Sequence, residues 1–177
     1  MKVFIACSSS PNLEKCYYKE MQKVCNMLCD NNYDLCFSPY DKGMLSVCYH
    51  TFKNRNRKVS GYTIDAYKIS LESMPDVECK IEDSSFDRLK AFYNDCGLFL
   101  FMPGGSGTLG EMFGVLEEGK NNLQDKKIVL YNYKNFFDGL LKFIETSKQN
   151  GFVLEGDLKN LIIVNNFEEL EAICKGK

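Results

Sequence analysis

The hydrophobic positions of the chain alternate between short continuous runs and longer stretches in which apolar residues recur every three or four positions. Such short runs are typical of buried strands, and the longer spacing is typical of amphipathic helices. The pattern predicts strands at residues 2–7, 33–38, 59–64, 77–81, 97–102, 126–131 and 161–164. It predicts helices at residues 11–31, 43–52, 84 onward, 107–119, 135–149 and 167–174. Residues 65–76 favour no element.

Two helix starts are indicated by capping residues. Ser10 precedes Pro11, which suits an N-cap followed by the first helical position. Ser84 and Asp87 have the spacing of a capping box, with Asp in place of Glu or Gln. The apolar face expected for the helix after Ser84 consists of Phe86, Leu89, Phe92 and Tyr93.

Strands that alternate with helices require right-handed crossovers and form a parallel sheet. The unbroken apolar run at residues 97–102 fits a central strand that is covered on both faces. We therefore predict an α/β fold, a Rossmann-like, doubly wound parallel sheet in a single domain over residues 1–177. Ligands of such sheets bind beyond the carboxyl ends of the strands, so the search for a site starts at the loops that follow residues 7, 38, 81 and 102.

Composition excludes several classes of function. Lys plus Arg number 22 and Asp plus Glu number 24, so there is no basic field to hold nucleic acid or an anionic membrane. No run reaches the roughly 18 apolar residues of a membrane span, and the apolar start is too short for a signal peptide. These features predict a cytoplasmic protein that binds neither nucleic acid nor membrane.

The nine cysteines are odd in number and scattered in spacing. Cys25 and Cys29 lie one helical turn apart, but no second pair with zinc spacing follows, and His50 is too close to Cys48 for a usual ligand pair. We therefore predict no metal site. Free and mostly buried thiols are the better interpretation.

The strongest chemical signal is the segment PGGSGTLGE at residues 103–111, which follows the most apolar strand and opens a helix. Glycines let the backbone approach a ligand, and the free amides of a helix N-terminus attract an anion. The segment is neither a Walker loop nor the dinucleotide fingerprint. A plain strand-to-helix turn is the alternative. The candidate phosphate-binding residues are Gly104, Gly105, Ser106, Gly107 and Thr108.

Glu111 lies one turn into this helix, on the side of Thr108 and Val115. It is expected to point away from an apolar stripe of Leu109, Met112, Phe113 and Leu116. The carboxylate either acts on a ligand or simply compensates the helix dipole. Gly110 and Gly114 indicate close approach of another helix, either within the chain or across a dimer.

The string PGGSGTLGE resembles the motif Pro-Gly-Gly-x-Gly-Thr-x-x-Glu of the LOG (Lonely guy) family, many members of which were once labelled lysine decarboxylases. The segments at residues 6–10, 59–64, 136–141, 150–153 and 166–170 are also similar to that family. A second family motif places its Arg at Arg88, although the surrounding residues differ. A third, glycine-rich motif after the second strand is matched clearly only at Gly43 within residues 38–46.

The resemblance implies hydrolysis of the N-glycosidic bond of a nucleoside 5′-monophosphate, to give a free base and ribose 5-phosphate. It implies that Glu111 and Arg88 are catalytic, that no cofactor is used, and that the protein is a homodimer. Ser8, Ser9 and Gly43 are weaker candidates for contacts to the base or ribose. The alternatives are a non-catalytic nucleotide-binding protein and a molybdenum-cofactor-binding protein of the same fold. Lysine decarboxylation is disfavoured because no site for pyridoxal phosphate is visible.

Overall fold

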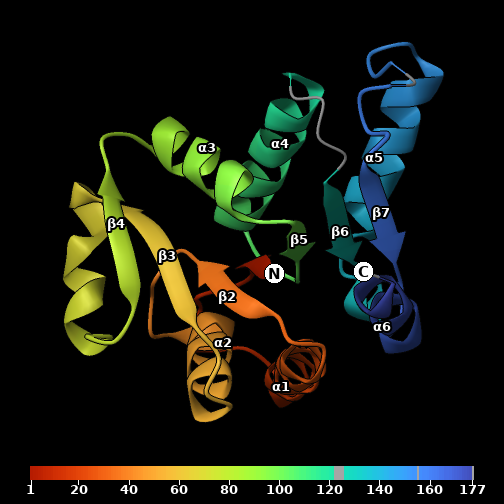
Figure 1. Cartoon of the computed structure of the whole chain (residues 1–177). Coiled ribbons are helices and arrows are strands. Elements are labelled where there is room, and N and C mark those ends of the chain that lie inside the picture. Colours follow the sequence, from red (N-terminus) through yellow and green to blue (C-terminus); the bar gives the residue numbers. More distant parts are fainter. Residues whose placement is uncertain (122–125, 155, 177) are drawn as a thin grey trace.

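A computed structural model describes residues 1–121, 126–154 and 156–176 (Figure 1). Its strands are β1 (Lys2–Ala6), β2 (Asp34–Phe37), β3 (Val59–Ile64), β4 (Glu78–Glu82), β5 (Leu98–Phe101), β6 (Lys127–Tyr131) and β7 (Leu161–Val164). Its α-helices are α1 (Lys15–Asp30), α2 (Gly43–Asn54), α3 (Ser85–Asp95), α4 (Ser106–Asn121), α5 (Asp138–Gln149) and α6 (Phe167–Lys175). The described residues also form two 3₁₀ helices, η1 (Asp65–Ser73) and η2 (Tyr133–Asn135).

The seven strands form one sheet in the order β4-β3-β2-β1-β5-β6-β7, and every neighbouring pair is parallel. From the central strand β1, strands β2 to β4 are added on one side of the sheet and strands β5 to β7 on the other. The strand order therefore reverses at β1, which lies between β2 and β5. Phe4 of β1 pairs with Cys36 on one side and with Phe99 on the other. The Rossmann-like parallel sheet and the single domain predicted from the sequence are confirmed.

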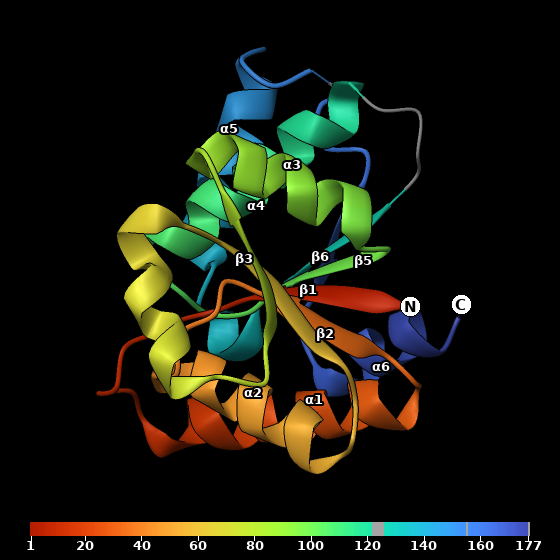
Figure 2. The ribbon, with the colours of Figure 1, turned by 60° about the vertical axis from the view of Figure 1, so that its left-hand side comes forward.

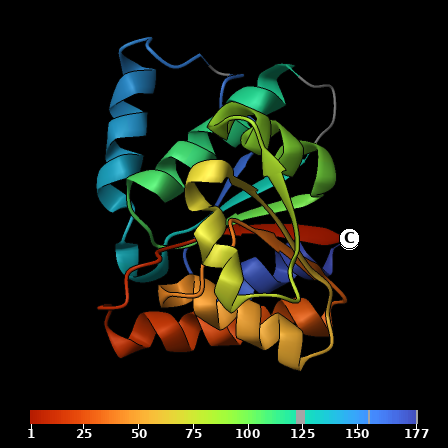
Figure 3. The ribbon, with the colours of Figure 1, turned by 90° about the vertical axis from the view of Figure 1, so that its left-hand side faces the viewer.

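Helices cover both faces of the sheet, as Figures 2 and 3 show. Helices α1, α2 and α6 lie on one face, and α3, α4 and α5 lie on the other (Figure 2). Successive side chains of β1 point alternately toward the two layers of helices, because side chains alternate across a strand. Val3 and Ile5 belong to the core under α1, α2 and α6, whereas Phe4 and Ala6 belong to the core under α3 and α4.

The N-terminus of α1 corrects one prediction. The helix begins at Lys15, five residues after Ser10, and no side chain caps it. Hydrogen bonds to distant segments hold the preceding loop instead. The Ser8 N–H donates to the Pro103 carbonyl (3.1 Å), and the Met44 N–H donates to the Ser8 carbonyl (2.9 Å). These bonds tie the chain to the glycine loop and to α2 before a helix can begin. The prediction at Ser84 is confirmed, since its side chain accepts from the Asp87 N–H at 3.1 Å.

Two predicted core residues are instead exposed. Phe86 in the first turn of α3 is 84% exposed, and Phe113 of α4 is 40% exposed. In α4 the buried side includes Thr108 and Val115. Gly114 packs on Leu89 of α3, where a Cβ would lie 2.6 Å from Leu89 Cδ1. That contact fixes the rotation of α4, so the side that carries Glu111 faces the molecule rather than solvent.

The cysteines fit their prediction. All nine are free thiols, and seven of them are buried. In the described part of the chain, no helix has both the length and the apolar character needed to cross a membrane.

Candidate active site

A pocket of about 600 Å³ lies where the loops after β1, β2, β3 and β5 meet helices α3 and α4. This position is beyond the carboxyl ends of the strands, where ligands of such sheets bind. The pocket wall includes eight of the ten predicted site residues: Ser8, Ser9, Arg88, Gly105, Ser106, Gly107, Thr108 and Glu111. The other two, Gly104 and Gly43, lie outside this wall.

The N-terminus of α4 lines the pocket with backbone amides that have no hydrogen-bond partner among the described residues. The Leu109 N–H donates to the Gly105 carbonyl (3.1 Å), which closes the first helical turn. The three amides of residues 106–108 therefore have no carbonyl partner within the helix. Residues 105–107 are exposed, and a helix N-terminus favours negative charge. The arrangement can bind a phosphate group.

Packing within the chain accounts for one glycine of this loop but not for two others. A Cβ on Gly104 would lie 2.1 Å from Thr108 Oγ1, so the chain itself needs glycine there. At Gly105 and Gly107 a Cβ would meet no protein atom within 4 Å, and neither residue has positive φ. Neither packing nor backbone conformation explains glycine at these two positions. Glycine at these positions leaves room for a ligand to approach the backbone.

Glu111 and Arg88 meet inside the pocket. Arg88 Nη2 lies 3.4 Å from Glu111 Oε1, and the two side chains are only 14% and 15% exposed. Burial raises the pKa of Glu111 above the usual value for glutamate, while the Arg88 guanidinium and a Ser38 hydroxyl act in the opposite direction. Arg88 Nε is buried and has no hydrogen-bond partner among the described residues.

Sequence reasoning missed Ser38 as a site residue. Its hydroxyl donates to Glu111 Oε1 at 2.8 Å, although the two residues are 73 positions apart. The available signal was its position, the first residue after β2 and therefore at the carboxyl edge of the sheet. Tyr40 and Tyr67 also line the pocket and were not predicted.

Gly43 has a structural explanation. It has a φ of 58°, which favours glycine, and a Cβ there would lie 2.5 Å from the carbonyl carbon of Ser9. It therefore lets the N-terminus of α2 pack beneath the backbone of residues 8–10. Its effect on the pocket is indirect, through the loop that carries Ser8 and Ser9.

The remaining titratable group in the pocket wall that bears on mechanism is Cys7. Burial raises the pKa of its thiol well above the usual range, which makes it a poor nucleophile at neutral pH. Among the residues that the structure describes, no lysine lines this pocket. Within residues 1–121, 126–154 and 156–176, no cluster of three His, Cys, Asp or Glu residues has a geometry suited to a metal ion.

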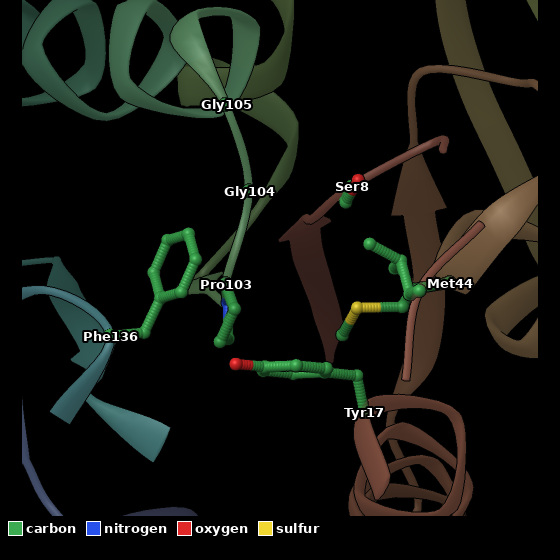
Figure 4. Close-up of a pocket in the computed structure, with 8 residues that line it drawn as sticks. Ser8, Tyr17, Met44, Pro103, Gly104, Gly105 and Phe136 are labelled. Atoms are coloured by element: carbon green, nitrogen blue, oxygen red, sulfur yellow. The ribbon is translucent and has the colours of Figure 1, made fainter. Parts of the chain in front are cut away.

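A smaller cavity of about 170 Å³ adjoins the glycine loop (Figure 4). Its wall is largely apolar and includes Leu13, Tyr17, Met44, Pro103 and Phe136. Phe136 and Tyr17 project toward the space beside Pro103, and Met44 closes the opposite side (Figure 4). Ser8 and Gly105 line both cavities, so the two adjoin at the glycine loop.

The chain is similar to curated proteins described as cytokinin riboside 5′-monophosphate phosphoribohydrolases. It is 29% identical over 97 residues to one from Mycobacterium marinum, which is 55% of this chain and 52% of that protein. It is 26% identical over 155 residues to a probable one from Oryza sativa, which is 86% of this chain and 63% of that protein. The chain thus spans between half and two thirds of these two relatives. An Arabidopsis thaliana protein is 24% identical and is matched over 96% of this chain and 80% of its own length.

Solved structures support the fold. A molybdenum cofactor carrier protein from Chlamydomonas reinhardtii matches with a TM-score of 0.66 and 11% identity, over 98% of this chain and 95% of its own. A molybdenum cofactor binding protein from Rippkaea orientalis matches with a TM-score of 0.66 and 13% identity, over 98% and 94%. The family model described as "Possible lysine decarboxylase" matches residues 46–174, which include Arg88, the glycine loop and Glu111. The chain therefore belongs to this family, the LOG family to which PGGSGTLGE pointed.

Proposed function

We propose that the protein hydrolyses the N-glycosidic bond of a nucleoside 5′-monophosphate and releases a free base and ribose 5-phosphate. The observation that carries the proposal is the placement of Glu111, paired with Arg88, in the same pocket as the free amides of α4. Phosphoribohydrolase names among the relatives support the reaction class.

The phosphate would bind at the N-terminus of α4. The amides of residues 106–108 and the Thr108 hydroxyl would donate to its oxygens, and the helix dipole would favour its charge. Contacts to the phosphate do not change during the reaction, so their energy serves to position the anomeric carbon near Glu111. Ser8 and Ser9, across the pocket, would contact the ribose or base.

Glu111 would act on the sugar. The bond between the anomeric carbon and the base nitrogen breaks, the base leaves with the electron pair, and positive charge develops on the sugar. The carboxylate stabilises that charge and accepts a proton from the attacking water, whose oxygen bonds to the anomeric carbon. That proton then passes to the departing base nitrogen, which completes the free base and restores the carboxylate. Arg88 orients Glu111, and its guanidinium, which lines the pocket, would interact with the departing base or the phosphate.

A panel of nucleoside 5′-monophosphates tests the proposal. Each is incubated with the protein, and free base and ribose 5-phosphate are quantified together by chromatography. We expect both products in equal amounts from at least one nucleotide, with AMP the first to try. Adenosine, which lacks the phosphate, should have a kcat/KM at least about a hundredfold lower, since positioning energy is lost. Equal kcat/KM values for AMP and adenosine would contradict the phosphate site.

The competing proposal is a protein that binds a nucleotide or the molybdenum cofactor without turnover. The departures of residues 38–46 from the family pattern favour it, because this loop flanks the pocket. The same panel separates the two proposals. Binding of a nucleotide or pterin by calorimetry, with no product after prolonged incubation, would support the carrier and contradict the hydrolase.

A further inference from the structure

Ser38 is held in place by the residues on either side of it. Phe37, the last residue of β2, is fully buried, and Pro39 is buried against β3. A Cβ on Gly61 of β3 would lie 2.7 Å from Pro39 Cγ, which shows how closely the two segments pack. The backbone on both sides of Ser38 is thus fixed before any ligand binds. Its hydroxyl is aimed at Glu111, 2.8 Å away.

Ser38 and Arg88 engage the same oxygen of Glu111. The Ser38 hydroxyl and Arg88 Nη2 both contact Oε1, at 2.8 and 3.4 Å. Within the described part of the chain, Oε2 accepts no hydrogen bond. Two donors on one oxygen restrain the carboxylate and leave its second oxygen without a hydrogen bond from the described residues. A carboxylate held by Arg88 alone, at the longer distance, would lack this restraint.

The surroundings of Glu111 make a neutral donor useful. The charged and titratable groups that face it are Arg88 from α3 and Cys7 at the end of β1, with Tyr40 and Tyr67 elsewhere in the pocket wall. Burial raises the pKa of Glu111, and the Ser38 hydroxyl opposes that rise because it donates to the charged form. Ser38 therefore favours the ionised carboxylate without adding charge to the pocket.

We propose that Ser38 is a positioning residue, which holds Oε1 of Glu111 so that Oε2 faces the anomeric carbon. The inference rests on the proposed hydrolysis for its catalytic meaning. Ser38 lies in the segment that departs from the family's glycine-rich pattern, so this chain supplies a side-chain donor of its own at that edge of the site. A serine that serves only the packing of this loop predicts no shift of the pH profile.

The test compares Ser38→Ala with Ser38→Thr, which keeps a hydroxyl. With the nucleotide substrate, Ser38→Ala should lower kcat about tenfold or more with little change in KM, and should move the acidic limb of the pH profile upward. Ser38→Thr should restore the profile. Ser147→Ala is the matched control, because it removes a serine hydroxyl bonded to the Phe143 carbonyl (2.9 Å), a bond within α5 that is remote from the pocket. A uniform loss at every pH in Ser38→Ala would overturn the inference.

A second measurement does not depend on turnover. The carboxyl carbon of Glu111, assigned with Glu111→Gln, is titrated by ¹³C NMR in the wild type, Ser38→Ala and Ser147→Ala. We expect a higher titration midpoint in Ser38→Ala only. Absence of hydrolysis in the wild type would contradict the proposed function, and the NMR titration would then decide the inference alone. An unchanged midpoint in folded Ser38→Ala would overturn it.

Discussion

At the scale of single residues, Glu111 combines two properties that oppose each other. Its side chain is mostly buried, which disfavours a carboxylate, yet its proposed role needs the negative charge. Arg88 and Ser38 both stabilise the ionised carboxylate, because Arg88 supplies positive charge and Ser38 supplies a hydrogen-bond donor. A buried carboxylate with dedicated partners in a pocket is typical of a functional group and not of dipole compensation on a surface helix.

Replacement of Glu111 by Gln tests this residue directly. The amide has the same shape but neither stabilises a positive sugar nor accepts a proton, so hydrolysis should fall at least about a hundredfold. Nucleotide affinity and thermal stability should change little, because the phosphate contacts belong to the start of α4. Turnover is measured by base release and affinity by calorimetry. Near wild-type turnover in the folded variant would remove Glu111 from the mechanism.

The pH dependence of the wild type follows from the same carboxylate. Burial raises the pKa of Glu111, and the reaction requires the ionised form. Activity should therefore be present above this raised pKa and be lost as the pH falls through it. The acidic limb of kcat/KM should lie above the usual glutamate pKa of about 4.3. A limb at or below that value, in protein that remains folded by circular dichroism, would contradict the role of Glu111.

At the scale of elements, the first turn of α4 determines whether the glycine loop serves a ligand. Gly107 and Gly110 lie in the same helix, and a Cβ at either would meet no protein atom within 4 Å. Only Gly107 lines the pocket. Alanine favours a helix over glycine by about 1 kcal/mol, so neither replacement should destabilise the fold.

Gly107→Ala should therefore raise the KM for a nucleoside monophosphate about tenfold, because the new methyl group occupies space at the phosphate site. Gly110→Ala is the control, with the same change of residue in the same helix and an unchanged KM. Steady-state kinetics and thermal melting measure both variants. A KM for Gly107→Ala equal to that of the control would show that the loop binds no phosphate.

The elements also show what the sequence could predict. Strands such as β5 were predictable because continuous apolar runs report burial on both faces. The start of α1 was not, because Ser10 and Pro11 resemble a cap, whereas bonds from Ser8 to distant loops decide the conformation there. The rotation of α4 depends on the contact between Gly114 and Leu89. The bond from Ser38 to Glu111 joins residues that only the completed sheet brings together.

At the scale of the whole molecule, the two layers of helices leave part of the α3 and α4 surface apolar. Phe86 of α3 is 84% exposed and Phe113 of α4 is 40% exposed. Gly114 packs within the chain, so it no longer argues for a dimer, while Gly110 faces open space. We propose that the protein is a homodimer in which α4 lies in or near the interface, and that the partner helps to complete each active site.

The last prediction is the assembly itself. Sedimentation should show a species of twice the 20.3 kDa chain mass at micromolar concentrations, and dilution should lower activity along with association. Phe113→Glu should weaken association at least about tenfold, because burial of an unpaired charge at an interface is costly. Phe152→Glu is the matched control, since Phe152 is 84% exposed in the loop after α5. A 20 kDa species at every concentration would exclude the dimer, and a dimer that Phe113→Glu leaves intact would place the interface away from Phe113.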